Sequence, residues 1–244
     1  MSETFIITRP EEDAQHFMQA ARAAGHAVIA APLLSIHFRD DAEIPPLPWQ
    51  AVAITSANGA RAIARRKDRA QIVRARAVTV GPASAQAARE AGFADILRAD
   101  GDVRTVIAAI RAHLNPRNGP ILYASGAVTR GDLTRALGRD GFEVVRAVLY
   151  EAVAADALSP PARAALGGGE RGTVALYSPR TAKIWARLVR AAGLRDAALR
   201  WRHACLSENV AGALRESLGG QVRVMVAPAP HEEAMLRMLN LGGE

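Results

Sequence analysis

The chain contains one cysteine, Cys205, so it cannot form an intramolecular disulfide. No histidine pairs with Cys205 or with another histidine at the spacing typical of a metal site. Cys205 also lies within an apolar, strand-like segment, which favours a structural thiol over a nucleophile. These features predict a protein that works in a reducing cytoplasm and holds no metal.

The chain also lacks a long apolar segment. No run approaches the roughly 18 residues that a membrane-spanning helix needs. At the N-terminus, Glu3 precedes the short apolar run Phe5–Thr8, and no apolar core or cleavage site typical of a secretory signal follows. We therefore expect no membrane partner and a cytoplasmic location.

Aromatic residues are scarce, at 5% of the sequence, although the chain is strongly basic. Lysine and arginine number 31 against 24 aspartate and glutamate, which gives a formal charge of +7 and favours an anionic partner. The arginines are dispersed through helix-like segments and are not interleaved with aromatic residues. This pattern disfavours a nucleic-acid partner.

Several familiar catalytic and nucleotide-binding motifs are missing. The sequence contains no GxxxxGK[ST] loop, no GxGxxG fingerprint and no GxSxG elbow. The glycine-rich run at residues 167–172 follows a Pro/Ala-rich segment and precedes a strand-like one, so we interpret it as a flexible connector. The chemistry must therefore come from another arrangement.

Short apolar or β-branched runs alternate with helix-like segments along almost the whole chain, which predicts an α/β fold with parallel sheets covered by helices. The expected strands are residues 5–8, 28–31, 52–55, 77–80, 121–124, 144–150, 173–177, 203–206 and 222–226. The segments 44–49 and 159–172 are the expected loops or boundaries.

An internal repeat indicates two similar halves. Residues 5–34 align without gaps on residues 121–150, which sets Gly25 against Gly141. Residues 52–56 align on 174–178, and residues 81–85 align on 207–211. Chance similarity among alanine-rich units is the alternative for any single alignment, but three in a consistent order favour two related α/β domains.

Several expected strands end in a small or hydroxyl residue directly before a helix. Such turns gather at the carboxyl edge of a parallel sheet, where α/β folds bind ligands. Unpaired N–H groups and the helix dipole attract anions there. For Ser56, Ser125 and Ser178 the alternative is that each side chain caps its own helix.

The same turns, in this order, are similar to those of uroporphyrinogen-III synthases. The resemblance covers nearly the whole chain and rests on the motifs Thr8-Arg9-Pro10, Thr55-Ser56-Ala57-Asn58-Gly59, Val80-Gly81-Pro82-Ala83-Ser84-Ala85, Leu122-Tyr123, Arg130, Gly141, Leu149-Tyr150-Glu151, Ser178-Pro179-Arg180, Cys205-Leu206-Ser207 and Ala227-Pro228-Ala229-Pro230. Each motif is weak alone, and together they are specific.

The resemblance implies two doubly wound parallel-sheet domains joined by a two-stranded linker, with a ligand cleft between them. One domain would comprise residues 1–35 and 153–244, and the other, residues 39–150, would be inserted into it. The family acts as a monomer on hydroxymethylbilane, a linear tetrapyrrole with many carboxylates, and needs no cofactor. A transient hand-over from the preceding pathway enzyme is also expected.

The family's reaction is loss of the terminal hydroxyl to give an azafulvene, attack by the substituted carbon of the last ring, and cyclisation with that ring inverted. Because the hydroxyl leaves readily, proximity should provide most of the catalysis. Tyr150 matches the family's suspected acid, and packing at the end of a strand is the alternative for this residue. The residues expected to bind substrate are Arg9, Ser56, Asn58, Gly59, Gly81, Ser84, Ser125, Gly126, Arg130, Ser178, Arg180, Arg202, Ser207 and Asn209.

The sequence departs from the family pattern in its second half. Arg180, Asn209, Val210 and His231 stand where Ser or Thr is common, which weakens the assignment of contacts there. A second function also stays open on the sequence alone. A non-enzymatic two-domain binder or sensor of a small polyanion would share the fold, because fold alone does not fix function.

Overall fold

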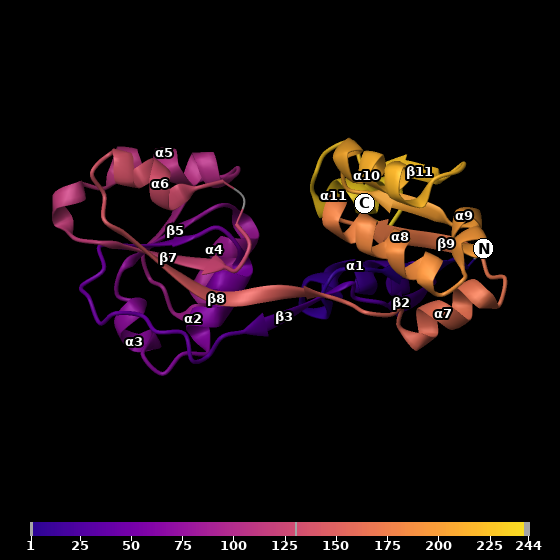
Figure 1. The fold of residues 1–244 in the computed structure, drawn as a ribbon, viewed down its shortest axis with the longest axis horizontal. Coiled ribbons are helices and arrows are strands. Elements are labelled where there is room, and N and C mark those ends of the chain that lie inside the picture. Colours follow the sequence, from indigo (N-terminus) through magenta and orange to yellow (C-terminus); the bar gives the residue numbers. More distant parts are fainter. Residues whose placement is uncertain (1, 130, 242–244) are drawn as a thin grey trace. The chain divides into compact units, whose positions relative to one another are not determined.

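The computed structural model describes residues 2–129 and 131–241. Contacts along the chain divide it into two compact units, which are shown in Figure 1. Unit 1 is Met1–Ser35 with Val153–Glu244, and unit 2 is Ile36–Ala152. That each unit folds by itself as a domain stays a prediction.

Unit 1 is built on a five-stranded parallel sheet with the order β11-β10-β9-β1-β2. Its strands are β1 (Thr4–Ile7), β2 (Ala27–Ala30), β9 (Gly172–Leu176), β10 (Arg202–Cys205) and β11 (Arg223–Val226). Its helices are α1 (Glu11–Ala23), α7 (Pro160–Gly167), α8 (Pro179–Ala191), α9 (Arg195–Arg200), α10 (Glu208–Leu218) and α11 (Glu232–Met238).

The sheet of unit 1 is covered by apolar side chains on both faces. In β1, Ile6 packs into one core cluster, whereas Phe5 and Ile7 pack into another. This division follows from the two-residue period of a strand. The first cluster contains the fully buried Trp185 and Trp201.

Unit 2 is built on a six-stranded sheet with the order β3-β8-β7-β4-β5-β6. Its strands are β3 (Leu34–Phe38), β4 (Ala51–Ile54), β5 (Arg76–Thr79), β6 (Ile96–Arg98), β7 (Ile121–Gly126) and β8 (Val144–Ala154). Its helices are α2 (Ala57–Ala64), α3 (Arg69–Ile72), α4 (Pro82–Ala91), α5 (Val103–His113), the 3-10 helix η1 (Pro116–Asn118) and α6 (Leu133–Arg139).

The chain passes between the units along β3 and β8, and these two strands are antiparallel. Arg39 N–H donates to the Leu149 carbonyl at 2.8 Å, and Ala155 N–H donates to the Leu33 carbonyl at 3.0 Å. As the residue number rises along β3, the number of the residue opposite in β8 falls. The chain leaves unit 1 and re-enters it at neighbouring positions.

The α/β architecture with parallel sheets is confirmed, and each predicted strand has a counterpart. The sequence analysis missed β3 and β6. The expectation of a loop over residues 159–172 was wrong for Pro160–Gly167, which form α7, and residues 168–171 are non-helical as expected. A proline ring fits the first helical position without loss of a hydrogen bond.

Strand order reproduces the internal repeat. The series β2-β1-β9-β10-β11 in unit 1 corresponds to β8-β7-β4-β5-β6 in unit 2 when the aligned segments are matched. None of the helices described is both long enough and apolar enough to cross a membrane.

Candidate active site

A pocket of about 700 Å³ lies at the carboxyl edge of the sheet in unit 2. Thr55 and Ser56 follow β4, Val80 follows β5, and Gly126 ends β7, so adjacent strands deliver these residues to one edge. The rest of its wall comes from residues 101–104, Val128, Thr129, Gly131 and Tyr150. Of the predicted site residues, the structure brings Ser56, Gly126 and Tyr150 into this pocket.

Ser56 lines the pocket and also caps α2. Its side-chain oxygen accepts a hydrogen bond from the Asn58 N–H at 3.3 Å, and its carbonyl accepts one from the Gly59 N–H at 3.0 Å. The Asn58 side chain accepts from Arg61 at 2.9 Å. A Cβ at Gly59 would lie 2.7 Å from the Ala124 carbonyl oxygen, so this glycine allows α2 to pack closely on β7.

Gly81 and Ser84 close the turn before α4 on themselves. The Gly81 N–H donates to the Ser84 hydroxyl at 3.1 Å, and that hydroxyl donates to the Gly81 carbonyl at 2.9 Å. Ser84 is buried. The Gly81 N–H and the Ser84 hydroxyl are therefore occupied within the turn itself.

Tyr150 contacts the end of β7 at a bulge. The pairing of β7 with β8 shifts by one residue between Ser125 and Gly126, which sets Gly126 opposite Tyr150. A Cβ at Gly126 would lie 2.9 Å from two ring carbons of Tyr150, so the ring occupies the space that a larger residue would need.

Burial raises the pKa of Tyr150 above its ordinary value, a hydrogen bond with the Ser56 side chain works in the opposite direction, and the neighbouring Tyr123 adds to the rise. The phenol therefore stays protonated at neutral pH and can donate a hydrogen bond. The hydroxyl of Tyr123 lies 3.2 Å from that of Thr55 on the same edge of the sheet.

Ser125 is buried and holds the backbone. Its hydroxyl donates to the Ala147 carbonyl at 3.1 Å and accepts from Arg146 Nε at 3.0 Å. Arg146 Nη2 also donates to the carbonyls of Gly126 and Ala127, each at 3.0 Å. Ser125 and Arg146 thus fix the segment that leads from β7 into the pocket.

Arg104 places an exposed cation on the pocket wall, in the first turn of α5. Asp102 caps this helix by accepting from the Arg104 N–H at 2.7 Å. Because an acidic side chain stabilises a helix N-terminus, Asp102 occupies the position that a ligand carboxylate would otherwise take. The predicted contact Arg130 lies outside the described residues.

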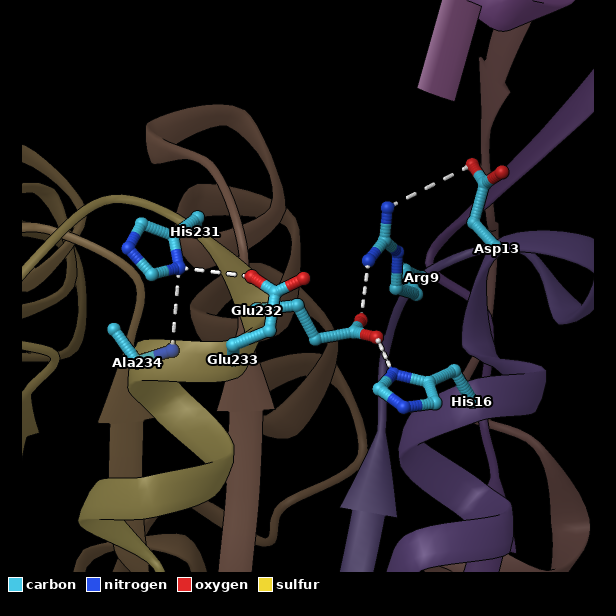
Figure 2. Close-up of polar contacts among 7 residues, drawn as sticks. All are labelled: Arg9, Asp13, His16, His231, Glu232, Glu233 and Ala234. Atoms are coloured by element: carbon cyan, nitrogen blue, oxygen red, sulfur yellow. Dashed lines mark hydrogen bonds and ion pairs between the residues drawn. The ribbon is translucent and has the colours of Figure 1, made fainter. Parts of the chain in front are cut away.

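In unit 1, Arg9 follows β1 and is held by acidic side chains. Figure 2 shows the Glu232 carboxylate reaching from α11 to Arg9, at 2.7 Å, and to His16, at 2.9 Å. Asp13 lies 4.0 Å from the same guanidinium, which also stacks over the Tyr177 ring at 4.6 Å from its centroid. Arg9 is therefore engaged inside unit 1.

The other predicted contacts of this edge belong to helix starts. Ser178 caps α8 through reciprocal bonds with Thr181, at 3.1 Å each. Arg180 is exposed in the first turn of α8, and Asn209 is exposed in the first turn of α10. Ser207 precedes α10, and no capping hydrogen bond of its side chain is found among the described residues.

Arg202 is not brought to this edge. It is the first residue of β10, so it lies at the amino edge of the sheet, where it pairs with Glu3. Its expected contact with substrate, which rests on the family resemblance, stays a prediction. Cys205 lies inside β10 as expected, and burial raises the pKa of its thiol to about 12.

Comparison with models of known protein families identifies the family of this chain. The family model described as "Uroporphyrinogen-III synthase HemD" matches residues 15–237. The chain belongs to the uroporphyrinogen-III synthase family. A search of curated protein sequences finds no match.

Solved uroporphyrinogen-III synthase structures share the fold. The Helicobacter pylori uroporphyrinogen-III synthetase is 16% identical, with a TM-score of 0.66 over 99% of this chain and 100% of that one. A mutant of the Thermus thermophilus uroporphyrinogen-III synthase is 18% identical, with a TM-score of 0.54 over 97% of this chain and 96% of that one. At such identities the likeness establishes the architecture.

Uroporphyrinogen-III synthases are lyases of tetrapyrrole biosynthesis, and membership confirms the resemblance inferred from the turn motifs. The sequence analysis missed Arg104, which lines the pocket in unit 2, and Arg146, which holds the segment that leads into it. Arg104 stands among dispersed arginines, and Arg146 lies inside a strand, so neither carries a local signal. Only the folded structure shows that Arg104 lines the pocket with Tyr150 and that Arg146 bonds the backbone of Gly126.

Proposed function

We propose that this chain cyclises hydroxymethylbilane to uroporphyrinogen III with inversion of the last pyrrole ring and loss of water, and that Tyr150 assists departure of the hydroxyl. Family membership supports the reaction. The observation that supports the role of Tyr150 is its protonated phenol in the pocket wall, hydrogen-bonded with Ser56 and packed against Gly126.

In this mechanism the phenol proton moves to the terminal hydroxyl, the carbon–oxygen bond breaks, and water leaves. An electron-poor azafulvene unit remains, and the substituted carbon of the last ring attacks it. This attack forms a bond at a carbon that already carries the bridge to the neighbouring ring, so the old bridge bond breaks and leaves a second azafulvene unit on that neighbouring ring. The free carbon of the last ring then attacks this unit, which closes the macrocycle with the last ring inverted. That carbon loses one proton, which returns to Tyr150. Because the leaving group departs readily, holding the tetrapyrrole in one reactive geometry is the larger contribution.

The substrate carboxylates need cations, and Arg104 is the first candidate. At the Ser56 and Gly81 turns, the N–H groups of Asn58, Gly59 and Gly81 are already used within the turns. A guanidinium can bind a carboxylate through two parallel hydrogen bonds. We assign Arg104 to a carboxylate near the reacting end of the substrate.

Arg9 is a second candidate in unit 1. Its partner there is the Glu232 carboxylate at 2.7 Å, so a substrate carboxylate would replace one anion by another. The remaining predicted contacts of that edge, Ser178, Arg180, Ser207 and Asn209, stay predictions.

The test is turnover of freshly generated hydroxymethylbilane, followed by separation of the uroporphyrin isomers. We expect isomer III in excess over a protein-free reaction, which closes without inversion. Binding of the tetrapyrrole with no change in the isomer ratio would contradict the proposal and favour a non-enzymatic binder.

The working state of the enzyme is part of the proposal. We expect a monomer in the cytoplasm that needs no cofactor and binds no nucleic acid, in keeping with a single buried cysteine and dispersed arginines. The ready departure of the hydroxyl supports a direct hand-over of substrate from the preceding enzyme, because time free in solution allows uncatalysed closure.

A further inference from the structure

A second pocket, of about 350 Å³, lies at the amino edge of the sheet in unit 1. Gly172, Arg202 and Arg223 are the first residues of β9, β10 and β11, so this pocket is at the opposite end of the strands from the turns described above. Its remaining lining residues are Ser2, Glu3, Arg171 and Arg200.

The strand register forces two of these arginines together. Arg202 and Arg223 are direct partners in the parallel pairing of β10 with β11, so their side chains leave the same face of the sheet. Like charges at directly opposed positions destabilise a sheet. Both arginines are exposed, and solvent screens part of this repulsion.

One carboxylate lines the pocket, and it is already committed. Glu3 accepts from the Thr173 hydroxyl at 2.6 Å and from the Arg202 guanidinium. Arg200 donates to the Asp196 carbonyl at 3.3 Å. Among the described residues, the side chains of Arg171 and Arg223 have no hydrogen bond or ion pair, and the nearby Glu170 accepts from Thr4 at 3.2 Å.

Four guanidinium groups therefore surround a space that one carboxylate only partly neutralises. Guanidinium groups match carboxylate and phosphate oxygens in bidentate geometry. The pocket has half the volume of the one in unit 2, which suits an anion of a few heavy atoms better than a tetrapyrrole.

We propose that this arginine pocket binds a small oxyanion with two or more negative charges, such as inorganic phosphate or a polycarboxylate. The site is separate from the proposed tetrapyrrole pocket and does not depend on its assignment. The anion would bridge Arg223 to Arg171 and relieve the repulsion between Arg223 and Arg202.

The experiment is calorimetric titration of the full chain with phosphate and with citrate at low salt. The pocket variant is Arg171→Gln combined with Arg223→Gln. The control is Arg22→Gln combined with Arg163→Gln, which removes the same charge from exposed positions of α1 and α7 in the same unit. We expect the pocket variant to bind about tenfold to a hundredfold more weakly and the control to match the wild type.

Thermal unfolding tests the arginine pocket independently of calorimetry. Arg223→Gln should not lower the melting temperature without ligand, because it removes a like-charge pair. Citrate should raise the melting temperature of the wild type and the control, and it should do so far less in the pocket variant. If the double variant does not fold, Arg223→Lys keeps the charge but loses the planar fork, and it should still weaken binding.

Three results would overturn the proposal. One is the absence of phosphate and citrate binding by the wild type at low salt. Another is equal affinity of the wild type and the pocket variant, or an equal loss in pocket variant and control. The third is displacement of citrate by uroporphyrin, which would assign these arginines to tetrapyrrole carboxylates.

Discussion

Tyr150 provides a direct test of acid assistance at the scale of a single residue. Tyr150→Phe keeps the ring against Gly126 and removes only the hydroxyl. General acids typically contribute about 10²–10⁴ in rate, and an easy leaving group places the expected loss of kcat near about 10². Steady-state formation of isomer III measures it, and the melting temperature should stay close to the wild-type value.

Tyr123→Phe is the matched control, because its hydroxyl meets Thr55 at 3.2 Å and is outside the pocket lining. This variant should turn over near the wild-type rate. A wild-type rate for Tyr150→Phe would show that Tyr150 only packs and that catalysis is conformational.

Arg104 should act on binding more than on chemistry. A carboxylate that keeps its contact from the bound substrate to the transition state contributes uniform binding, so its loss raises KM and leaves kcat unchanged. For Arg104→Gln we expect KM to rise about tenfold, since a charge-assisted hydrogen bond is worth about 1.5–3 kcal/mol. Arg139→Gln, at an exposed position in the last turn of α6, is the control. A fall in kcat at constant KM would contradict this assignment.

His203 predicts how stability depends on pH. Burial lowers its pKa from 6.5 to about 4, and a hydrogen bond with the Arg223 backbone offsets part of this effect. Trp185 Nε1 donates to His203 Nε2 at 3.1 Å, which needs the neutral ring. Between these two pKa values the unfolded chain binds a proton that the folded chain does not, so stability falls as pH drops from 6.5 to about 4.

The expected loss is on the order of 3 kcal/mol across this window. Urea unfolding at a series of pH values measures it. His203→Gln keeps an acceptor for Trp185 but does not titrate, so its stability should change less with pH than that of the wild type. The exposed His113→Gln should follow the wild-type curve. Parallel curves for all three proteins would contradict the prediction.

At the scale of an element, the bulge between β7 and β8 sets the position of the Tyr150 ring. A Cβ at Gly126 would lie 2.9 Å from two carbons of that ring, so Gly126→Ala must displace it. We expect a loss of about 1–3 kcal/mol in stability together with a loss of activity. Unfolding and turnover of the same preparation test both effects.

Gly81→Ala is the matched control at a neighbouring strand end. Gly81 has an extended backbone, with φ 179°, and no heavy atom lies within 4 Å of a Cβ built there. This variant should fold with wild-type stability. If Gly126→Ala were as stable and as active as Gly81→Ala, the Tyr150 ring would move freely at the bulge, which would contradict the prediction.

The elements themselves could largely be predicted from sequence, because central parallel strands are continuous apolar runs, such as Val52–Ile54 and Val174–Leu176. The missed strands lie at the edges of the sheet in unit 2 and are less buried: β3 alternates exposed and half-buried positions, and β6 has three residues. α7 was missed because prolines and glycines at its ends resemble those of a loop.

The candidate site could be predicted only in part. Strand ends that carry Ser56 and Gly126 are visible in the sequence, and the structure brings them to one pocket with Tyr150. The sequence does not show which hydrogen-bond donors are free to bind a ligand, because that depends on the side chains that lie next to each donor in the folded protein. Ser84 closes on Gly81, Arg146 holds Ser125, and Glu232 holds Arg9, and none of these contacts follows from spacing in an unaligned sequence.

At the scale of the whole molecule, both sheets repeat one strand order and differ in their edges. Unit 2 keeps an open pocket at its carboxyl edge, whereas unit 1 carries an arginine-lined pocket at its amino edge. The excess of basic residues, +7 over the chain, therefore includes a local concentration that the dispersed sequence pattern hides. The net charge of the chain does not reveal which edge of which sheet carries the clustered arginines.

The path of the chain predicts that unit 1 can fold without unit 2. The bonds that join Ala155 to Leu33 and Arg39 to Leu149 fix the antiparallel register, and this register sets Ser35 opposite Val153. Residues 36–152 can then be replaced by Asn-Gly, because a two-residue turn of this type joins directly opposed antiparallel positions. The core of unit 1, with Trp185 and Trp201, lies wholly in the segments that remain.

We expect the shortened chain to unfold cooperatively in urea, with protected amide hydrogens in β1, β9 and β10, since a continuous core and a complete five-stranded sheet are retained. Replacing Asn-Gly by a long flexible glycine–serine linker is the control, and it should cost little stability because the entropy of loop closure grows slowly with length. Neither shortened chain should bind a tetrapyrrole at the Tyr150 pocket, because residues 36–152 are removed. A shortened chain that stays unfolded with either connection would show that unit 1 depends on unit 2, and the two would then form one cooperative domain.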